Sequence, residues 1–251
     1  MGTHKSCPSY VKGKGMLLEE YIKQCTGSTK LNLSFLFKIL SISKTLSIQA
    51  HPDKVLATEL NKMQPEIYKD PNHKPELAVA LTPFEVLYGF LPPKKLIESI
   101  ESNPCFKVMI PEEHLKTFQK EIEEKKPLKN SLKIILQDIF TFDTPEKLPT
   151  AIQHLLKDID KIPVKDRTPH QNLSLRLYND HGNDIGIFIT FLMNYICLTE
   201  GQSLKIAANE LHAYVSGDCV ECMATSDNVL RCGLTPKHKD SKTLFSVSIN
   251  I

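Results

Sequence analysis

The spacing of apolar residues changes twice along the chain. Between residues 33 and 90, short apolar runs are separated by prolines, which is typical of strands joined by turns and one short helix. Between residues 92 and 198, apolar residues recur at the i, i+3, i+4 and i+7 positions of helices that bury one face. Short apolar runs return from residue 203 onward. The pattern predicts an α+β protein in which a helical segment interrupts a β domain.

Helical stripes are clearest in two segments of the middle region. Their apolar residues are Leu132, Ile135, Leu136 and Ile139 in the first, and Ile152, Leu155, Leu156 and Ile159 in the second. The charged segment 112–126 carries Leu115, Phe118 and Ile122 at the same spacing, so we interpret its charges as a solvated helix face. The most apolar stretch, 185–198, is shorter than the roughly 20 residues of a membrane-spanning helix and predicts a buried helix.

Three short strands are expected after the helical segment, over residues 204–208, 211–215 and 219–223. Turn-forming residues separate these strands at Asn209 and at the Ser-Gly-Asp sequence of residues 216–218. These strands return the chain to the β domain that began before the helices.

The domain division follows from these patterns, and composition is compatible with it. Residues 1–91 and 199–251 are expected to form two parts of one β domain, with residues 92–198 as the helical insertion. The 251 residues, 41% of them hydrophobic, can supply a substantial core. The formal charge of +2 comes from 31 basic and 29 acidic residues, too balanced a field to favour nucleic acid or an anionic membrane as partner. Any anion site must therefore be local.

Cysteine usage and the first residues suggest a cellular location. Seven cysteines, an odd number without the regular spacing of a disulfide framework, are expected to be reduced thiols. The first residues contain no apolar segment typical of a secretion signal. We therefore expect a cytoplasmic protein, and we expect it to be a monomer.

The densest group of candidate site residues lies in the segment 46–51. If this segment is a strand, Ser47, Gln49 and His51 share its polar face while the intervening residues form an apolar face. A glutamine and a histidine about 7 Å apart on one strand face can converge on a metal ion. A hydrogen-bonded polar face is the more ordinary explanation of the same pattern.

Two further pairs could complete such a site. Lys74 and Glu76 share a face in an extended segment, where the carboxylate could bind metal and the amine could handle protons or phosphate. The alternative for this pair is an exposed ion pair. His212 and Tyr214 also share a strand face, and here the alternative is a histidine bonded to backbone inside a barrel.

The Cys-x-x-Cys pair formed by Cys219 and Cys222 occurs in structural zinc sites and in redox sites. On a strand, however, two residues three apart point to opposite faces, and no second such pair follows. We therefore expect these cysteines to have a packing role.

Taken together, three segments resemble signature blocks of the type I phosphomannose isomerase family. They are LSIQAHPDK at residues 46–54, YKDPNHKPELAVALTPFEVLYGF at 68–90, and HAYVSGDCVECMATSDNVLRCGLTPKHKD at 212–240. The resemblance implies a cupin-like β-barrel or jelly-roll domain with an inserted helical domain. It also implies a zinc-dependent isomerase of carbohydrate metabolism and GDP-mannose biosynthesis, which interconverts mannose 6-phosphate and fructose 6-phosphate through an enediol.

The resemblance also implies roles for individual residues. One zinc ion per chain would be held by Gln49, His51, Glu76 and His212. The family's essential arginine corresponds to Arg231, and its phosphate-side lysine corresponds to Lys237. The remaining pocket positions correspond to Lys38 and Ser47, which resemble phosphate contacts, and to Lys74, Tyr214 and Glu221. The base that moves the proton is left open between Lys74 and Glu221.

The sequence departs from the family pattern at both ends. Its first residues resemble an internal family segment, and the stretch 241–251 drifts from the pattern. We therefore expect the β portion to be incomplete. The alternative to an active isomerase is a noncatalytic zinc-binding cupin-like protein, either a truncated isoform or a drifted copy.

Overall fold

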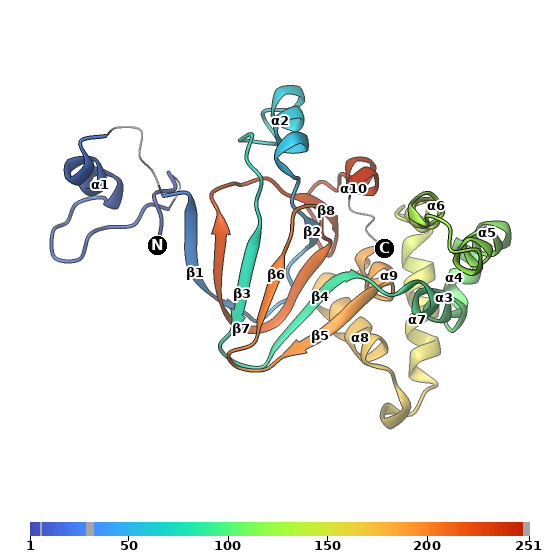
Figure 1. Ribbon diagram of the computed structural model, residues 1–251. Helices are drawn as coiled ribbons and strands as arrows, with labels where there is room; N and C mark the ends of the chain where they lie inside the picture. The colour runs from blue at the N-terminus through green and yellow to red at the C-terminus, as the bar shows by residue number, and fades with distance from the viewer. Residues whose placement is uncertain (6, 29–32, 248–251) are drawn as a thin grey trace.

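The computed structural model describes residues 1–5, 7–28 and 33–247. The strands in these ranges are β1 Phe35–Ile42, β2 Ile48–Ala50, β3 Glu76–Ala80, β4 Phe84–Phe90, β5 Met193–Leu198, β6 Ser203–Ile206, β7 His212–Ala224 and β8 Leu230–Gly233. All pairings between them are antiparallel, and the sheet order along the main path is β5-β4-β7-β2-β8. Strands β1 and β3 also pair with β7, and β6 pairs with β3 (Figure 1).

Strand β7 joins the two halves of the β domain by bending at Gly217. Its first part pairs with β4 and β2, and its second part pairs with β1 and β3. Gly217 adopts a φ of +102°, a conformation that side-chain-bearing residues rarely adopt. The expected turn at residues 216–218 was therefore wrong, because the glycine bends one continuous strand and each part finds new partners.

The helices follow a different distribution from the strands. They are α1 Leu18–Thr26, α2 Lys54–Met63, α3 Pro93–Glu101, α4 Pro104–Met109, α5 Glu112–Glu123, α6 Lys129–Phe140, α7 Leu148–Asp160, α8 Pro169–His181, α9 Gly186–Thr190 and α10 Ser241–Val247, with a 3-10 turn at Val164–Asp166. Helices α3 to α9 lie between β4 and β5 in sequence and gather on one side of the sheet, opposite α1 (Figure 1). The α+β fold class and the helical middle are thus confirmed, while the three domain boundaries stay predictions.

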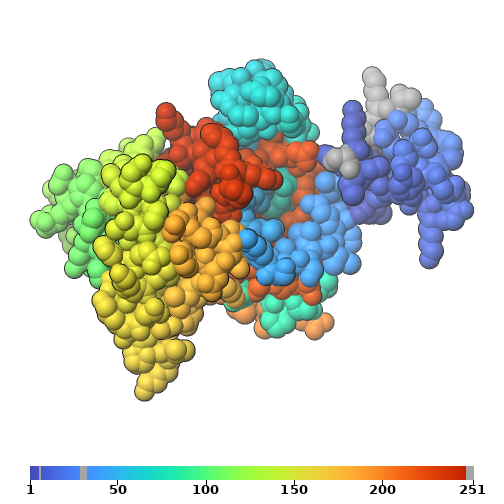
Figure 2. Space-filling view, turned by 180° about the vertical axis from the view of Figure 1, so that it is seen from behind, coloured from blue at the N-terminus to red at the C-terminus, as the bar shows by residue number. Residues whose placement is uncertain are grey.

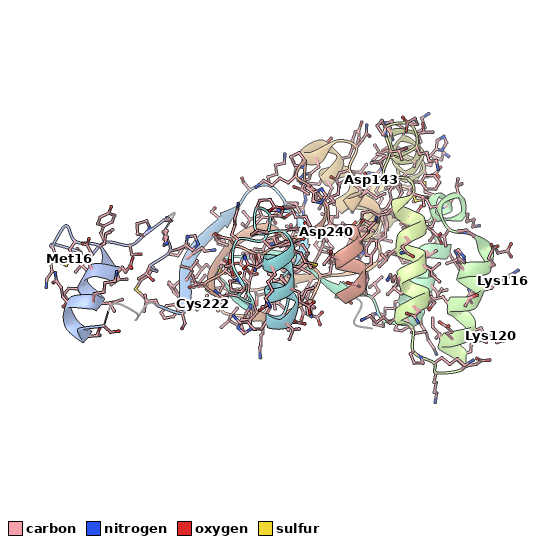
Figure 3. All side chains as sticks on the ribbon, turned by 90° about the horizontal axis from the view of Figure 1, so that it is seen from above. Met16, Lys116, Lys120, Asp143, Cys222 and Asp240 are labelled. Atoms are coloured by element: carbon pink, nitrogen blue, oxygen red, sulfur yellow. The ribbon has the colours of Figure 1, made fainter. Side chains whose placement is uncertain are left out.

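The apolar stripes bury as expected. All four stripe residues of α6 are buried, as are Ile152, Leu155 and Ile159 of α7. In α5, Phe118 is fully buried, whereas Lys116 and Lys120 project from the far end of the helical region (Figure 3). The charged segment is therefore a solvated helix face.

The stretch 185–198 differs from the expected single buried helix. It forms the short helix α9 and then strand β5, which pairs with β4 along its length. The prediction was wrong because a buried apolar run has no periodicity that separates helix from strand. Here the exposed edge of β4 provides the partner.

The core is divided between two clusters of buried side chains. One lies between the sheet and the helices and includes Ile48, Ala50 and Ala213. The other fills the interior of the β domain and includes Tyr214 and Cys219. Residues that alternate along β2 and β7 therefore face either the helices or the interior.

Polar contacts join the helical region to the sheet. The Glu85 carboxylate of β4 accepts hydrogen bonds from Ser216, Tyr195 and Arg176, the last of which lies on α8. Burial by itself raises the pKa of the Glu85 carboxyl, but these three donors outweigh it and hold the pKa below its usual value. A second contact joins the segment after β8 to the helices. Lys239 Nζ lies 2.8 Å from Oδ2 of Asp143, which is in the connection from α6 to α7 (Figure 3).

The cysteines, the apolar helices and the two ends of the chain were also subjects of prediction. All seven cysteines are free, with Cys219 buried and Cys222 partly exposed on β7. Within the described ranges, no helix is both long enough and apolar enough to span a bilayer. The N-terminal segment that carries α1 projects from the body of the molecule (Figure 2). Of the divergent stretch 241–251, residues 248–251 lie outside the described residues.

Candidate metal centre and substrate pocket

Three candidate residues form a row across neighbouring strands. Gln49 of β2 lies opposite His212 of β7 on one side and opposite Arg231 of β8 on the other. Residues directly opposite each other in an antiparallel pair point to the same face of the sheet. The β2 register therefore brings an amide, an imidazole and a guanidinium to one face.

The local sequence explains how His51 comes to this face. Ile48 and Ala50 are fully buried against the helices, so Gln49 and His51 point the opposite way. The strand ends at Ala50, and Asp53 then caps α2, because its Oδ1 accepts a hydrogen bond of 2.9 Å from the backbone N–H of Leu56.

Glu76 lies between the two histidines. It is the first residue of β3 and is only 4% exposed. Its Oε1 lies 3.2 Å from His51 Nε2, and its Oε2 lies 3.4 Å from His212 Nε2. Candidate ligand atoms of the three residues all lie within 4.8 Å of one another. Lys74 Nζ lies 3.3 Å from Glu76 Oε1, so the expected lysine–glutamate pair is formed, but it is largely buried.

Backbone carbonyls determine which nitrogen of each histidine faces Glu76. His51 Nδ1 lies 2.8 Å from the carbonyl oxygen of Asn228, and His212 Nδ1 lies 2.9 Å from that of Glu210. Each Nδ1 therefore carries the proton and donates it to a carbonyl, which leaves Nε2 as a lone-pair acceptor. Burial also lowers the pKa of His51 to about 4, so its ring is neutral near pH 7.

The resulting arrangement suits a cation. Among the described residues, the Nε2 atoms of His51 and His212 find no hydrogen-bond partner, and both are buried and face the Glu76 carboxylate. Three electron-donating groups so close together repel one another unless a positive charge lies among them. Imidazole nitrogen and carboxylate oxygen are ligands that zinc commonly takes, and neutral histidine is the form that binds it. The residues present therefore fit a zinc ion.

A second row lies farther along the same strand, β7. Lys38 of β1 and Ala78 of β3 both lie opposite Glu221. Lys38 Nζ lies 2.9 Å from Glu221 Oε2, and the Tyr214 hydroxyl donates to Glu221 Oε1 at 3.1 Å. Burial, together with the nearby carboxylates, raises the pKa of Tyr214, which therefore remains a neutral donor.

The other predicted residues differ in how closely they approach the metal centre. Ser47 donates a 3.1 Å hydrogen bond to Gln49 Oε1 and so orients the amide oxygen. The Arg231 side chain is half-buried and makes no hydrogen bond or ion pair with the described part of the chain. Lys237 is exposed on the segment that follows β8. The assigned roles of these residues stay predictions.

A cavity lies beside Lys74, the lysine that contacts Glu76. It measures about 320 Å³, and its lining includes Lys38, Lys74 and Met223. A larger cavity of about 720 Å³ lies among the helices, where it is lined by Asn103 and His170, and it contains none of the predicted site residues. Chemistry rather than size therefore marks the smaller cavity as the candidate substrate pocket.

Sequence reasoning missed the groups that orient the histidines. The carbonyls of Asn228 and Glu210 belong to the backbone, so no residue type marks them. Asn228 itself is held by its side-chain amide, which donates to the carbonyl oxygens of Asp70 and Asn72. The dense run of Asn, Asp and Ser in these two loops was the only available signal.

Comparison with known proteins agrees with the resemblance. Residues 1–93 match the family model of the phosphomannose isomerase type I catalytic domain. The chain is 40% identical to the probable mannose-6-phosphate isomerase of Dictyostelium discoideum, in an alignment that covers 97% of the chain and 58% of the relative. It is also 40% identical to mannose-6-phosphate isomerase 1 of Arabidopsis thaliana, over 98% of the chain and 60% of the relative.

Solved structures match as well. The mannose 6-phosphate isomerase of Salmonella typhimurium, bound to its substrate and to zinc, aligns with a TM-score of 0.81 at 26% identity. A mannose 6-phosphate isomerase bound with zinc and yttrium aligns with a TM-score of 0.80 at 26% identity. Each alignment covers 98% of this chain and 64% of the other protein. The cupin-like fold expectation is thereby confirmed.

The chain spans about 60% of the length of the curated relatives that it matches. Within that span, Gln49, His51 and Glu76 lie in the segment matched by the family model, and His212 lies beyond it. Over the part of their length that it spans, the chain is therefore similar in both sequence and structure to the type I phosphomannose isomerases.

Proposed function

We propose that this chain is an isomerase that interconverts mannose 6-phosphate and fructose 6-phosphate, with one zinc ion held by Gln49, His51, Glu76 and His212. The observation that carries the proposal is the pair of buried Nε2 atoms that face the Glu76 carboxylate and have no hydrogen-bond partner in the described part of the chain. The names of the relatives and the ligands of the solved structures support the choice of sugar phosphate and metal.

The reaction moves a proton between adjacent carbons and passes through an enediol. Zinc at this centre would polarise the sugar oxygens and offset the negative charge that develops on them. Arg231, in register with Gln49, adds a fixed positive charge on the same face of the sheet. Because its side chain makes no hydrogen bond or ion pair with the described part of the chain, it is available to contact the substrate.

Two groups can carry the proton. Lys74 lies beside Glu76, at the wall of the 320 Å³ cavity. Glu221 is buried and already accepts hydrogen bonds from Lys38 and Tyr214, so it can act only if one of these donors shifts toward the substrate. We retain both residues as candidate bases. The variants Lys74→Met and Glu221→Gln distinguish them. The variant that lacks the base should no longer exchange the proton at the reacting carbon of the substrate with solvent.

The phosphate group requires positive charge away from the metal. Lys38 lines the cavity, and Lys237 lies on the exposed segment after β8. We assign substrate binding to these two lysines together with Ser47 and Tyr214. Ser47 and Tyr214 would act mainly by orienting Gln49 and Glu221, to which they are hydrogen-bonded.

A coupled assay of the purified chain with mannose 6-phosphate tests the proposal. We expect turnover that is lost in a chelator and restored by zinc. A chain that binds zinc without turnover would instead support the noncatalytic alternative. A chain that turns over equally well in excess chelator would refute the role of the metal.

A further inference from the structure

The loop between β6 and β7 contacts the segment that follows β2 through a reciprocal pair of side chains. The backbone N–H of Asp53 donates to Asn209 Oδ1 at 3.1 Å, and Asn209 Nδ2 donates to Asp53 Oδ2 at 2.8 Å. The backbone N–H of Asn209 also donates to the carbonyl oxygen of His51 at 2.7 Å. Three hydrogen bonds therefore join Asn209 to the three-residue segment that begins with His51.

Each member of the pair is also tied to another part of the site. The remaining carboxylate oxygen of Asp53 caps α2, the helix that rises from the end of β2 (Figure 1). Asn209 precedes Glu210, whose carbonyl oxygen accepts the Nδ1 proton of His212. Asn209 has a φ of +64°, a left-handed conformation that asparagine tolerates better than most residues. One asparagine thus holds the backbone of one histidine and adjoins the acceptor of the other.

We propose that Asp53 and Asn209 are positioning residues that align His51 and His212 for metal binding. The proposal rests on the zinc site of the proposed function and goes beyond its ligand set. If the pair is broken, the β6–β7 loop and the start of α2 can move apart, and the two Nε2 atoms lose their common direction. Groups that orient metal-bound histidines typically contribute about 10–100-fold to metal affinity.

The chemistry of the pair requires one carboxylate and one amide. In Asp53→Asn, the new side-chain NH₂ faces the NH₂ of Asn209, so two donors oppose each other. If the Asn209 amide flips, its own NH₂ instead meets the backbone N–H of residue 53, which is again a donor. In Asn209→Asp, two carboxylates face each other. The swap Asp53→Asn with Asn209→Asp restores every bond, because the amide at position 53 donates to the carboxylate at position 209 and its oxygen still caps α2.

The test measures zinc dissociation constants for the zinc-free chain by competition with a chromophoric chelator. The wild-type chain, both single variants and the swap are compared, and the thermal unfolding of each zinc-free form is recorded in parallel. We expect each single variant to bind zinc about 10–100-fold more weakly and the swap to recover wild-type affinity. Rescue by the swap assigns the loss to this pair, and the unfolding of the zinc-free forms shows whether the loss of affinity exceeds the loss of stability.

The Asn103→Ala variant provides a control for the loss of a helix cap, because Asn103 also caps a helix, accepting a hydrogen bond from the Cys105 N–H, but lies in the helical segment. It should lower the unfolding temperature and leave zinc affinity unchanged. The proposal is overturned if both single variants bind zinc as tightly as the wild type, or if the swap binds no more tightly than the singles. A wild-type chain that binds no zinc would overturn the zinc site as well. Zinc binding with normal swap rescue but no isomerisation would overturn only the proposed function.

Discussion

Replacement of Gly217 by alanine is expected to destabilise the β domain strongly. Gly217 lies where β7 leaves its pairing with β4 and continues against β1, with a φ of +102°. A Cβ atom at this position would overlap the carbonyl oxygen of Pro83 and lie 3.0 Å from Phe84 Cα. Both atoms belong to the backbone, so the overlap cannot be relieved by a side-chain rotation.

Two costs determine the size of the effect. An alanine held in this sparsely populated conformation costs about 1–3 kcal/mol. Overpacking against a rigid backbone adds about 1–3 kcal/mol. Together they are on the order of 4 kcal/mol, a large fraction of the roughly 5–15 kcal/mol by which a typical domain is stable.

Gly182 provides the control, since it also has a positive φ, of +65°, but its Cβ would meet nothing within 4 Å. Gly182→Ala should therefore cost only the conformational penalty of about 1–3 kcal/mol. Urea unfolding followed by circular dichroism gives the free energy of unfolding of each variant. If Gly217→Ala is no less stable than Gly182→Ala, the overlap with the backbone of residues 83 and 84 does not carry the cost assigned to it, and the prediction is wrong.

Three further outcomes are expected. The double variant His51→Ala, His212→Ala should contain almost no zinc by elemental analysis, against about one ion per chain in the wild type; unchanged content would reject the ligand set. Arg231→Ala should lower kcat about 10²–10³-fold, whereas Lys237→Ala should mainly raise KM, by about tenfold; equal losses in kcat with unchanged KM would reject this division of roles. Glu85→Gln should destabilise the chain at pH 7. Because the folded-state pKa of Glu85 is depressed, this difference should persist above about pH 4.5 and shrink as the pH falls further through the folded-state value, in unfolding measured across pH; a difference independent of pH would contradict it.

Local periodicity explains why part of the site could be predicted from the sequence. The alternation around β2 assigned Gln49 and His51 to one face, and the structure has them there. The same reasoning could not bring His212 to them, because pairing between distant strands leaves no local pattern. The ligand set came from the resemblance to a family rather than from spacing.

Other features of the structure could not be predicted from the sequence, for identifiable physical reasons. The Ser-Gly-Asp sequence around Gly217 is typical of a turn, and only the presence of β1 and β3 as partners makes it a bend within one strand. The hydrogen bonds that orient the histidines end on backbone carbonyls of Asn228 and Glu210. Such acceptors depend on the path of the loops, which composition does not determine.

The helical insertion leaves the ligand geometry intact because it begins and ends at paired strands. Phe90 of β4 lies opposite Met193 of β5, so the chain leaves the sheet and returns to it at neighbouring positions. Ligands before and after the insertion are therefore brought together by β7 and its partners rather than by the helices. The helices still pack against the opposite face of β2, because they cover Ile48 and Ala50, the neighbours of Gln49 on that strand. Loss of that cover would expose the apolar face of β2 and remove the reason for Gln49 and His51 to face the interior.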